Sequence, residues 1–297
     1  MFEFMFQLYH LHNRKLLVFS LLVLALCVGS LFVNYARTGE FAARGVSLKG
    51  GITLTVPVGG AVDIRQLQTV LSSELSGADI NVRGIANKGV LAALIVEASD
   101  VEEFVLLDAL RAQGIVLDEG KYSVEVMGSG LGQNFFRQTF YAVLFAFLCM
   151  SLVVYVTFRD LVPSFFVILA AFSDIVSTLA VVSFFEIKLS TAGIAAFLML
   201  IGYSVDTDIL LTTRVLKRKE GSLNERIESA VRTGLLMSLT SLVAVVLAYF
   251  FTDSDVIRQI MFILLVGLCF DVLYTWAQNA GILRLYLERG VVKNGQA

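Results

Sequence analysis

The chain has few of the residues that usually build metal sites and disulfide frameworks. Among its 297 residues are three cysteines and two histidines. Cys27, Cys149 and Cys269 lie far apart, each inside a run of apolar residues. Separated thiols of this kind predict neither disulfide bonds nor a metal site. We therefore expect no metal and no cofactor.

Charged residues are also scarce. They make up 16% of the chain, whereas hydrophobic residues make up 57%, and the mean hydropathy is +0.79. Soluble domains contain about 25% charged residues, so this composition argues against a soluble protein. It predicts a polytopic α-helical membrane protein. The net charge of −2 gives no reason to expect a nucleic acid as a partner.

Six apolar runs are long enough to cross a membrane as helices. At about 1.5 Å per residue, a hydrocarbon core of about 30 Å requires roughly 20 residues. The first run continues into Asn34 and Tyr35 and is longer than the apolar core of a signal peptide, so we interpret it as a retained anchor. The predicted spans are residues 16–33, 139–158, 162–185, 191–213, 234–251 and 259–283.

Basic residues gather on one side of these spans. Because six spans place both termini on the same side, the positive-inside rule assigns that side to the cytoplasm of a cell-membrane protein. The basic residues on this side are Arg14, Lys15, Arg159, Arg214, Lys217, Arg218, Lys219, Arg226, Arg232, Arg284, Arg289 and Lys293. The predicted parts are the N-terminus with the first span (1–35), an external region (36–132), the remaining spans (133–285) and a cytoplasmic tail (286–297).

The external region has the pattern of a small α+β domain. Its apolar residues alternate in some segments and follow helical spacing in others. The predicted strands are residues 51–57, 79–85, 90–97 and 122–127, and the predicted helices are residues 63–75 and 100–113. The order βαββαβ predicts a ferredoxin-like fold. The region contains no His or Cys, so we expect it to dock or handle a substrate rather than to perform chemistry.

A glycine-rich link joins this domain to the second span. It reads Gly128-Ser129-Gly130-Leu131-Gly132. Glycine has wide backbone freedom, so the link either forms a simple turn or lets the domain swing against the membrane part. Gly128, Gly130 and Gly132 are the candidate hinge residues.

Four acidic residues lie inside the predicted spans. They are Asp174 in the third, Asp206 and Asp208 in the fourth, and Asp271 in the sixth. A charge near the bilayer centre costs about 2.5 to 3.5 kcal/mol on insertion scales, so such residues usually face a protein interior or a wet cavity and mark an ion route. No Lys or Arg lies equally deep in these runs. We therefore predict that the four acids form a proton or ion pathway, neutralised by protons, water or a transported cation.

Helical spacing places the acids on polar or small faces. Asp174 shares a stripe with Ser177 and Thr178, whereas the stripe of Asp271 contains Tyr274, Thr275 and Gln278. Residues two positions apart are separated by about 200° around an α-helix. We therefore expect Asp206 and Asp208 to face different surroundings, one the ion path and the other a neighbouring helix or a partner subunit.

Two other interpretations of the acids are open. A single intramembrane Asp can cap a helix or bond to a neighbouring helix, although four acids without a base are hard to explain in this way. Paired acids that share a proton also catalyse hydrolysis, as in intramembrane aspartyl proteases. The Tyr-Asp and Gly-x-Gly-Asp motifs of that class are absent at these positions, so no enzymatic activity is expected.

The sequence around the acids resembles a known family. The run from Gly202 to Asp208 reads Gly-Tyr-Ser-Val-Asp-Thr-Asp and continues into Thr213-Arg214. Together with residues 126–132 and the tripeptide after the second span, it resembles the SecF family of protein-export membrane proteins over nearly the whole chain. The motif residues are Gly202, Tyr203, Ser204, Arg214, Phe158, Arg159 and Asp160.

This resemblance implies a function and partners. It implies six spans that form half of an RND-like transporter, a hetero-complex with SecD, and a position beside the SecY translocon in the membrane lipid. It also implies use of the proton motive force to draw secretory preproteins outward. A stand-alone RND-like exporter of a lipid or small molecule is the alternative, although such transporters normally contain two six-helix halves.

The chain departs from the family pattern at one place. Bacterial members usually read Asn-Asp-Thr where this chain reads Asp206-Thr207-Asp208, so the bacterial acid aligns with Thr207. The resemblance therefore leaves open which neighbouring Asp has that role, and whether protons or sodium ions are coupled. The Asp-Thr-Asp version looks like the archaeal branch, in which no SecA motor is expected.

Overall fold

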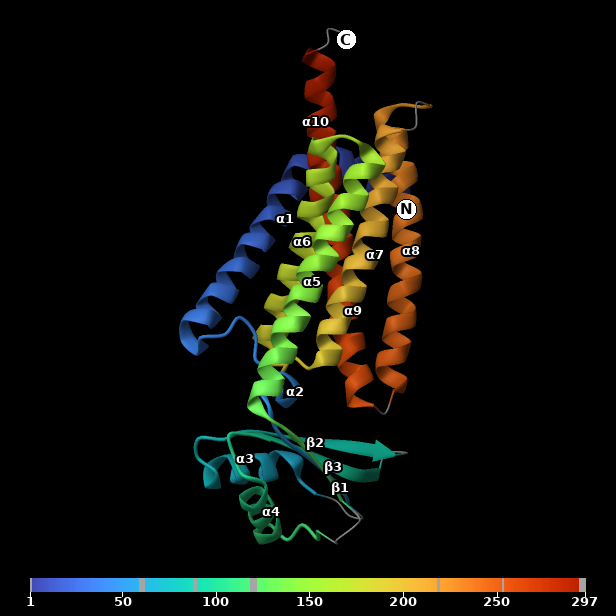
Figure 1. Cartoon of the computed structure of the whole chain (residues 1–297). Coiled ribbons are helices and arrows are strands. Elements are labelled where there is room, and N and C mark those ends of the chain that lie inside the picture. Colours follow the sequence, from blue (N-terminus) through green and yellow to red (C-terminus); the bar gives the residue numbers. More distant parts are fainter. Residues whose placement is uncertain are drawn as a thin grey trace.

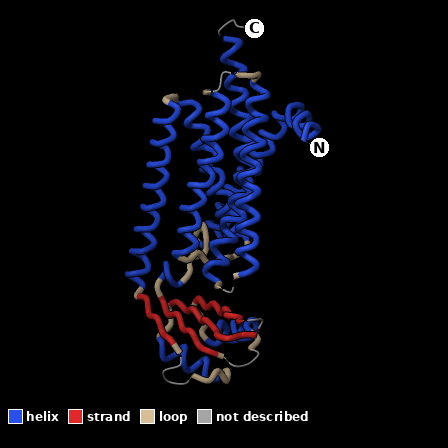
Figure 2. The backbone as a smooth tube through the Cα atoms, turned by 90° about the vertical axis from the view of Figure 1, so that its right-hand side faces the viewer, coloured by secondary structure: helices blue, strands red, loops and turns tan. Residues whose placement is uncertain are grey.

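The computed structural model describes residues 2–58, 62–87, 90–117, 122–217, 220–252 and 254–293. A bundle of long helices carries an α+β domain at one end, and both chain termini lie toward the other end (Figures 1 and 2). We call the two ends of the bundle the domain end and the terminal end. The prediction of a polytopic helical protein with a small α+β domain is confirmed.

The bundle contains six helices long and apolar enough to cross a membrane. The candidate spans are Arg14–Thr38, Asn134–Phe158, Leu161–Phe184, Thr191–Leu216, Leu223–Phe251 and Val256–Glu288. The helices themselves are α1 (Phe2–Thr38), α5 (Ser129–Phe158), α6 (Leu161–Phe184), α7 (Thr191–Leu216), α8 (Leu223–Phe251), α9 (Asp255–Leu273), the π-helical segment η1 (Tyr274–Asn279) and α10 (Ala280–Lys293), the last three being consecutive parts of one span. The fifth span begins eleven residues earlier than predicted, because Ser222 and Glu225 form a capping box at its start.

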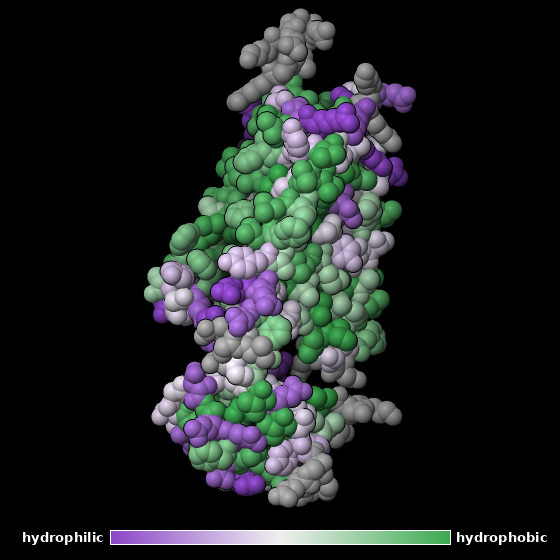
Figure 3. Space-filling model, in the orientation of Figure 1, coloured by the Kyte–Doolittle hydropathy of each residue, from purple (hydrophilic) through white to green (hydrophobic). Residues whose placement is uncertain are grey.

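Helices α6 and α7 form the centre of the bundle. Half of the residues in the apolar stretch of each helix are buried, compared with 6% in α5 and 17% in α8. Helix α7 contacts α5, α6, α8 and α9. The outer helices therefore present large apolar surfaces, and Figure 3 shows hydrophobic side chains over the bundle between a hydrophilic terminal end and a mixed α+β domain.

The α+β domain has the predicted ferredoxin-like topology. Its elements are β1 (Gly51–Pro57), α3 (Ile64–Glu74), β2 (Asp79–Asn87), β3 (Val90–Ser99), α4 (Glu103–Ala112) and β4 (Ser123–Met127). The strands form an antiparallel sheet in the order β2-β3-β1-β4. Burial alternates along β1, and the buried side includes Leu54 and packs against Leu71 of α3 and Leu110 of α4. The sheet lies next to the bundle, and α3 and α4 lie on its far side (Figures 1 and 2).

The connection from α1 to the domain is fastened to the bundle. After α1, residues 39–50 include the short helix α2 (Val46–Lys49). Gly45 N donates to Leu189 O at 2.8 Å, and Leu189 N donates to Ala43 O at 2.8 Å. The loop between α6 and α7, which contains Leu189, therefore holds this connection by backbone hydrogen bonds.

Ion pairs also hold the domain against the bundle. Lys188 in the α6–α7 loop pairs with Asp79 at the start of β2, and Lys49 pairs with the same carboxylate at 3.4 Å. Burial raises the pKa of Asp79, but the hydrogen bond and the positive charge of Lys188, together with Lys49, outweigh it. The pKa of Asp79 is therefore lower than its ordinary value.

Most of the glycine-rich link, predicted as a turn or a hinge, lies inside helix α5. Helix α5 begins at Ser129, so Gly130 and Gly132 lie in its first turn, and Gly128 is the residue before it. A Cβ atom at Gly132 would collide with the backbone of Lys49 and Gly50. Gly132 thus allows close contact between α5 and the connection after α1, and only Gly128 lies outside a helix. The predicted boundary at residue 132 falls three residues after the start of α5.

Candidate functional site

Three of the four intramembrane acids meet at the centre of the bundle. Asp174 of α6, Asp208 of α7 and Asp271 of α9 are completely buried. They converge because α6, α7 and α9 pack against one another through faces of small and polar residues, as the spacing predicts for Asp174 and Asp271. We call these three residues the carboxylate cluster.

Each acid of the cluster accepts hydrogen bonds from a neighbouring span. Ser204 of α7 donates to Asp174 Oδ2. Thr207 of α7 donates to Asp271 Oδ1 at 2.9 Å, and Thr275 donates to the same oxygen at 3.1 Å. Helix α7 is thereby linked to both α6 and α9.

The third acid has an amide as its partner. Asn279 Nδ2 donates to Asp208 Oδ1 at 2.7 Å. Asn279 is the last residue of η1, and all six residues of this π-helical segment are buried. The same segment bonds to α6, since Tyr274 Oη lies 2.6 Å from Ser177 Oγ and Gln278 Nε2 donates to Ser173 Oγ at 3.2 Å. η1 therefore connects α6 and α7 across the cluster.

The π-helical segment was not predicted. π-Helical turns are rare and occur frequently at functional sites. A π turn contains more residues than an α turn, which here places Tyr274, Thr275, Gln278 and Asn279 all in the interior. The stripe predicted for Asp271 contained the first three of these residues but not Asn279. Two adjacent amide side chains within an apolar span are the signal that could have indicated it.

The cluster is not compensated by a base. Among the described residues, no Lys or Arg forms an ion pair with Asp174, Asp208 or Asp271. One oxygen of each carboxyl group also has no hydrogen-bond partner in this part of the chain. The three groups are close enough to interact electrostatically. Three mutually repelling, buried charges would be very costly, so the cluster requires bound protons or a cation.

Asp206 lies on a different face of α7. It is exposed, whereas Asp208 is completely buried, as the angle between them predicts. The exposed face of α7 consists of Thr191, Ala195, Met199, Gly202, Tyr203 and Asp206. A Cβ atom at Gly202 would have no neighbour within 4 Å among the described residues. A carboxylate on an otherwise weakly polar, unpacked helix face at membrane depth is unfavourable beside lipid chains.

The comparisons with known proteins identify the family. The family model for the C-terminal part of the protein export membrane proteins SecD/SecF matches residues 110–289. The protein-export membrane protein SecF of Methanothermobacter thermautotrophicus is 40% identical over 248 residues, which cover 82% of this chain and 84% of that protein. SecF of Pyrococcus furiosus is 36% identical over 280 residues, covering 93% and 92%. This chain belongs to the SecF family.

The solved structures show the same fold in a longer protein. The crystal structure of SecDF from Thermus thermophilus, described as a translocon-associated membrane protein, matches with a TM-score of 0.72 and 20% sequence identity. The match covers 93% of this chain but 38% of the SecDF chain. The SecF-family chain thus has the fold of one part of SecDF.

The remaining motif residues lie near the terminal end of the bundle. Arg214 Nη1 donates to Ser229 O at 2.6 Å and to its Oγ at 2.7 Å, which links α7 to α8. Arg159 ends α5 in the left-handed conformation, with φ of 55°. Asp160 precedes α6 and accepts from Ser164 Oγ through its backbone oxygen at 2.7 Å. The ring of Phe158 lies 5.8 Å from Lys217 Nζ.

These contacts separate the motif into two parts. Ser204 donates a hydrogen bond to the carboxylate cluster, whereas Gly202 and Tyr203 lie on the exposed face of α7. Phe158, Arg159, Asp160 and Arg214 instead shape the helix connections away from the cluster.

In the described part of the chain, no group of three or more His, Cys, Asp or Glu side chains is arranged to bind a metal ion.

Proposed function

We propose that this SecF-family chain works in a hetero-complex with a SecD-type partner and uses the proton motive force to help move secretory preproteins through the SecY translocon. Family membership supports protein export. The need for a partner is supported by the match to 38% of SecDF and by the exposed face of α7, which contains an acid. Both features are expected of one half of a two-part membrane protein.

The proposed topology places the α+β domain outside the cell and both termini in the cytoplasm. The positive-inside rule supports it, because Arg159 directly follows α5, Lys217 directly follows α7 and Arg284 lies in α10, and these helix ends are at the terminal end of the bundle. Residues 36–132 then form the external part, with Gly128 as the candidate hinge between β4 and α5. A substrate emerging from a channel would meet this external part.

The carboxylate cluster is the observation on which the proton role depends. One face of helix α7 is bonded by its own polar residues to three neighbouring segments, with Ser204 bonded to α6, Thr207 to α9 and Asp208 to η1. A carboxylate only accepts hydrogen bonds, whereas a protonated carboxyl group also donates one. A change of protonation therefore changes which of these bonds α7 can keep, and it biases the bundle between two arrangements.

The membrane potential can supply the energy for such a change. Moving one elementary charge through 100 mV yields about 2.3 kcal/mol, which corresponds to a shift of roughly 50-fold in a two-state equilibrium. We assign the proton path to Asp208, Asp174 and Asp271, since these acids interact with one another. We assign Asp206 to the interface with the SecD-type partner, because it lies on the exposed face.

The test compares two neighbouring acids in the same helix. The chain is reconstituted in vesicles with its SecD-type partner and the channel, and preprotein export is measured with and without an imposed proton gradient. We expect Asp208→Asn to lower export to the level seen without a gradient. Asp206→Asn should keep the gradient response at saturating partner but reduce copurification of the partner. Unchanged gradient-dependent export by Asp208→Asn would refute the proton role.

Two controls make this test specific. Glu220→Gln removes an exposed carboxylate in the connection between α7 and α8, outside the family motif, and it should leave export unchanged. Replacing the proton gradient by a sodium gradient of equal size separates the two candidate ions. Gradient-dependent export that follows sodium alone would contradict proton coupling.

Two alternative functions receive less support. A stand-alone exporter of a lipid or small molecule would require a complete transporter, whereas the similar proteins of the same length are named as protein-export membrane proteins. A protease would use two acids of the cluster, but the family is not known for enzymatic activity. Cleavage of a membrane peptide that Asp174→Asn abolishes would favour the protease over the export subunit.

A further inference from the structure

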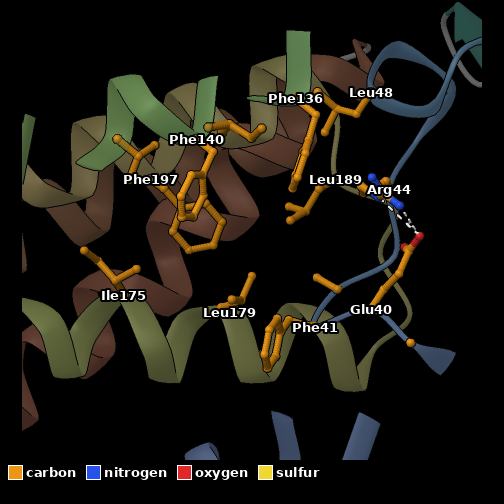
Figure 4. Close-up of a pocket in the computed structure, with 14 residues that line it drawn as sticks. Glu40, Phe41, Arg44, Leu48, Phe136, Phe140, Ile175, Leu179, Leu189 and Phe197 are labelled. Atoms are coloured by element: carbon orange, nitrogen blue, oxygen red, sulfur yellow. Dashed lines mark hydrogen bonds and ion pairs between the residues drawn. The ribbon is translucent and has the colours of Figure 1, made fainter. Parts of the chain in front are cut away.

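A partly open apolar cavity lies at the domain end of the bundle. Its volume is about 440 Å³, roughly three times that of an engineered apolar cavity that binds benzene. It lies between the start of α5, the second half of α6, the start of α7 and the connection after α1 (Figure 4). Phe136, Phe140, Ile175, Leu179, Leu189 and Phe197 line it.

The lining excludes a role in the proton path. The wall contains aromatic and aliphatic side chains, and the charged groups among the lining residues are Glu40 and Arg44. An ordered water needs two to four polar partners, and the aromatic and aliphatic wall supplies none. Asp174 precedes the lining residue Ile175, but its carboxyl group bonds to Ser204 inside the cluster. The cavity therefore suits a hydrocarbon and not an ion or a water chain.

The cavity lies where the apolar run of α5 begins. Phe140 follows the polar residues Arg137, Gln138 and Thr139, so it lies close to the boundary expected for the hydrocarbon layer at the domain end. Phe140 and Phe41 border the cavity and are 58% and 48% exposed. Helix α5 is the least buried span of the bundle. The side of α5 therefore leaves the cavity accessible to an apolar ligand from the surroundings of the bundle.

A cationic group is placed where a lipid headgroup would lie. Arg44 bonds to Glu40 through Nε and Nη2, the latter at 2.5 Å, and its guanidinium group stacks 5.0 Å from the Phe136 ring. Nη1 has no hydrogen-bond partner among the described residues. Ion pairs continue from Glu40 to Lys49 and on to Asp79 and Lys188. Together with Arg44, this network of ion pairs contains three bases and two acids. The surplus positive charge and the free guanidinium nitrogen are complementary to a phosphate group.

We propose that this cavity binds one hydrocarbon chain of an anionic membrane phospholipid, with the phosphate group beside Arg44. The bound chain fills the space between the connection after α1 and helices α5 to α7. The bound hydrocarbon chain thereby stabilises the contact between the α+β domain and the bundle. Leu189 lines the cavity and also forms backbone hydrogen bonds to the connection after α1. This site does not depend on the export function proposed above.

The test uses a phospholipid probe with a diazirine at the end of one chain. The purified protein is reconstituted in vesicles containing this probe, illuminated, and digested for peptide mapping. We expect labelling concentrated on residues 136–143, 175–179 and 194–197. Leu179→Trp, which fills the cavity from α6, should lower that labelling about tenfold, the equivalent of ~1.4 kcal/mol of binding. Val143→Phe fills the cavity from α5 and should act in the same direction.

The matched control is Phe172→Trp on the outer face of the same helix. Phe172 is 48% exposed and does not line the cavity, so this substitution should leave the labelling unchanged. Labelling that is spread evenly over α1, α5 and α8, or that responds equally to Phe172→Trp, would show general lipid exposure and overturn the proposal. Displacement of the probe by an apolar peptide but not by unlabelled phospholipid would also overturn it.

The headgroup is tested by two substitutions with opposite effects. Arg44→Gln should abolish the preference of the labelling for an anionic over a zwitterionic probe. Glu40→Gln removes the competing carboxylate and should strengthen that preference. An identical response to both probes in the wild-type chain and in both variants would refute the phosphate contact.

Discussion

The packing of Gly234 against Trp276 offers a direct test of how the π-helical segment supports the carboxylate cluster. Gly234 lies in α8, and a Cβ atom there would collide with the Cζ2 and Cη2 atoms of the Trp276 ring. Trp276 is a residue of η1 and is 5% exposed, within a core that includes Leu211 and Ile227. Gly234→Ala therefore forces a buried ring to move.

The size of the effect follows from two opposing terms. Overpacking a buried site costs about 1–3 kcal/mol, whereas Ala in place of Gly inside a helix stabilises by up to about 1 kcal/mol. We expect a net loss of about 0.5–2 kcal/mol in the free energy of unfolding. Gly202→Ala makes the same chemical change in α7 without a collision, because nothing lies within 4 Å of its Cβ position. It should stabilise the isolated chain slightly.

The assay is chemical unfolding of the purified chain in mixed micelles, followed by the loss of helical circular dichroism. Trp276→Phe provides space for the new methyl group, so the double variant should recover stability relative to the sum of the two single changes. We expect a coupling of about 1 kcal/mol between the two positions. Additive effects within about 0.5 kcal/mol, or equal effects of Gly234→Ala and Gly202→Ala, would refute this account.

Two further predictions concern the domain contact and the cluster. Asp79→Asn should weaken the docking of the α+β domain by about 0.5–1 kcal/mol, a range typical of partly exposed ion pairs, seen as a broader distance distribution between spin labels on the domain and the bundle. The pKa of Asp79 is lowered from 3.8, so its contribution to domain docking is fully present above pH 3.8 and is lost as the pH falls through the lowered pKa. Loosening of the domain already near neutral pH would contradict this pH dependence. Asn279→Leu removes the donor to Asp208 and should destabilise the chain by about 1–3 kcal/mol and reduce gradient-dependent export; wild-type export and stability together would contradict it.

The sequence alone predicts the large features of this fold well. Membrane spans and short strands have different apolar periods, so the six spans and the order βαββαβ follow from residue spacing. Asp174 and Asp271 are recognisable because a carboxylate in an apolar run is costly wherever it lies. The capping box at Ser222 and Glu225 was also present in the sequence, and it would have placed the start of α8 correctly.

Other features depend on tertiary contacts and could not be predicted in the same way. Spacing shows that Asp206 and Asp208 point in different directions, but only the positions of α6 and α9 show that Asp208 is the buried one. The glycines after Gly128 indicate flexibility when read alone. In the structure, Gly132 instead allows two backbones to touch, which no local pattern indicates.

The π-helical turn also has a consequence for the helix that follows it. Each residue advances an α-helix by about 100°, so one additional residue in η1 rotates the faces of α10 relative to those of α9 by about that angle. The residues of α10 that enter the core, Ala280 and Leu283, are therefore out of phase with the buried positions of α9. An apolar pattern counted straight through the sixth span is wrong by one position after Asn279. Deleting a single residue from this turn would restore the uninterrupted phase and turn a different side of α10 toward α7.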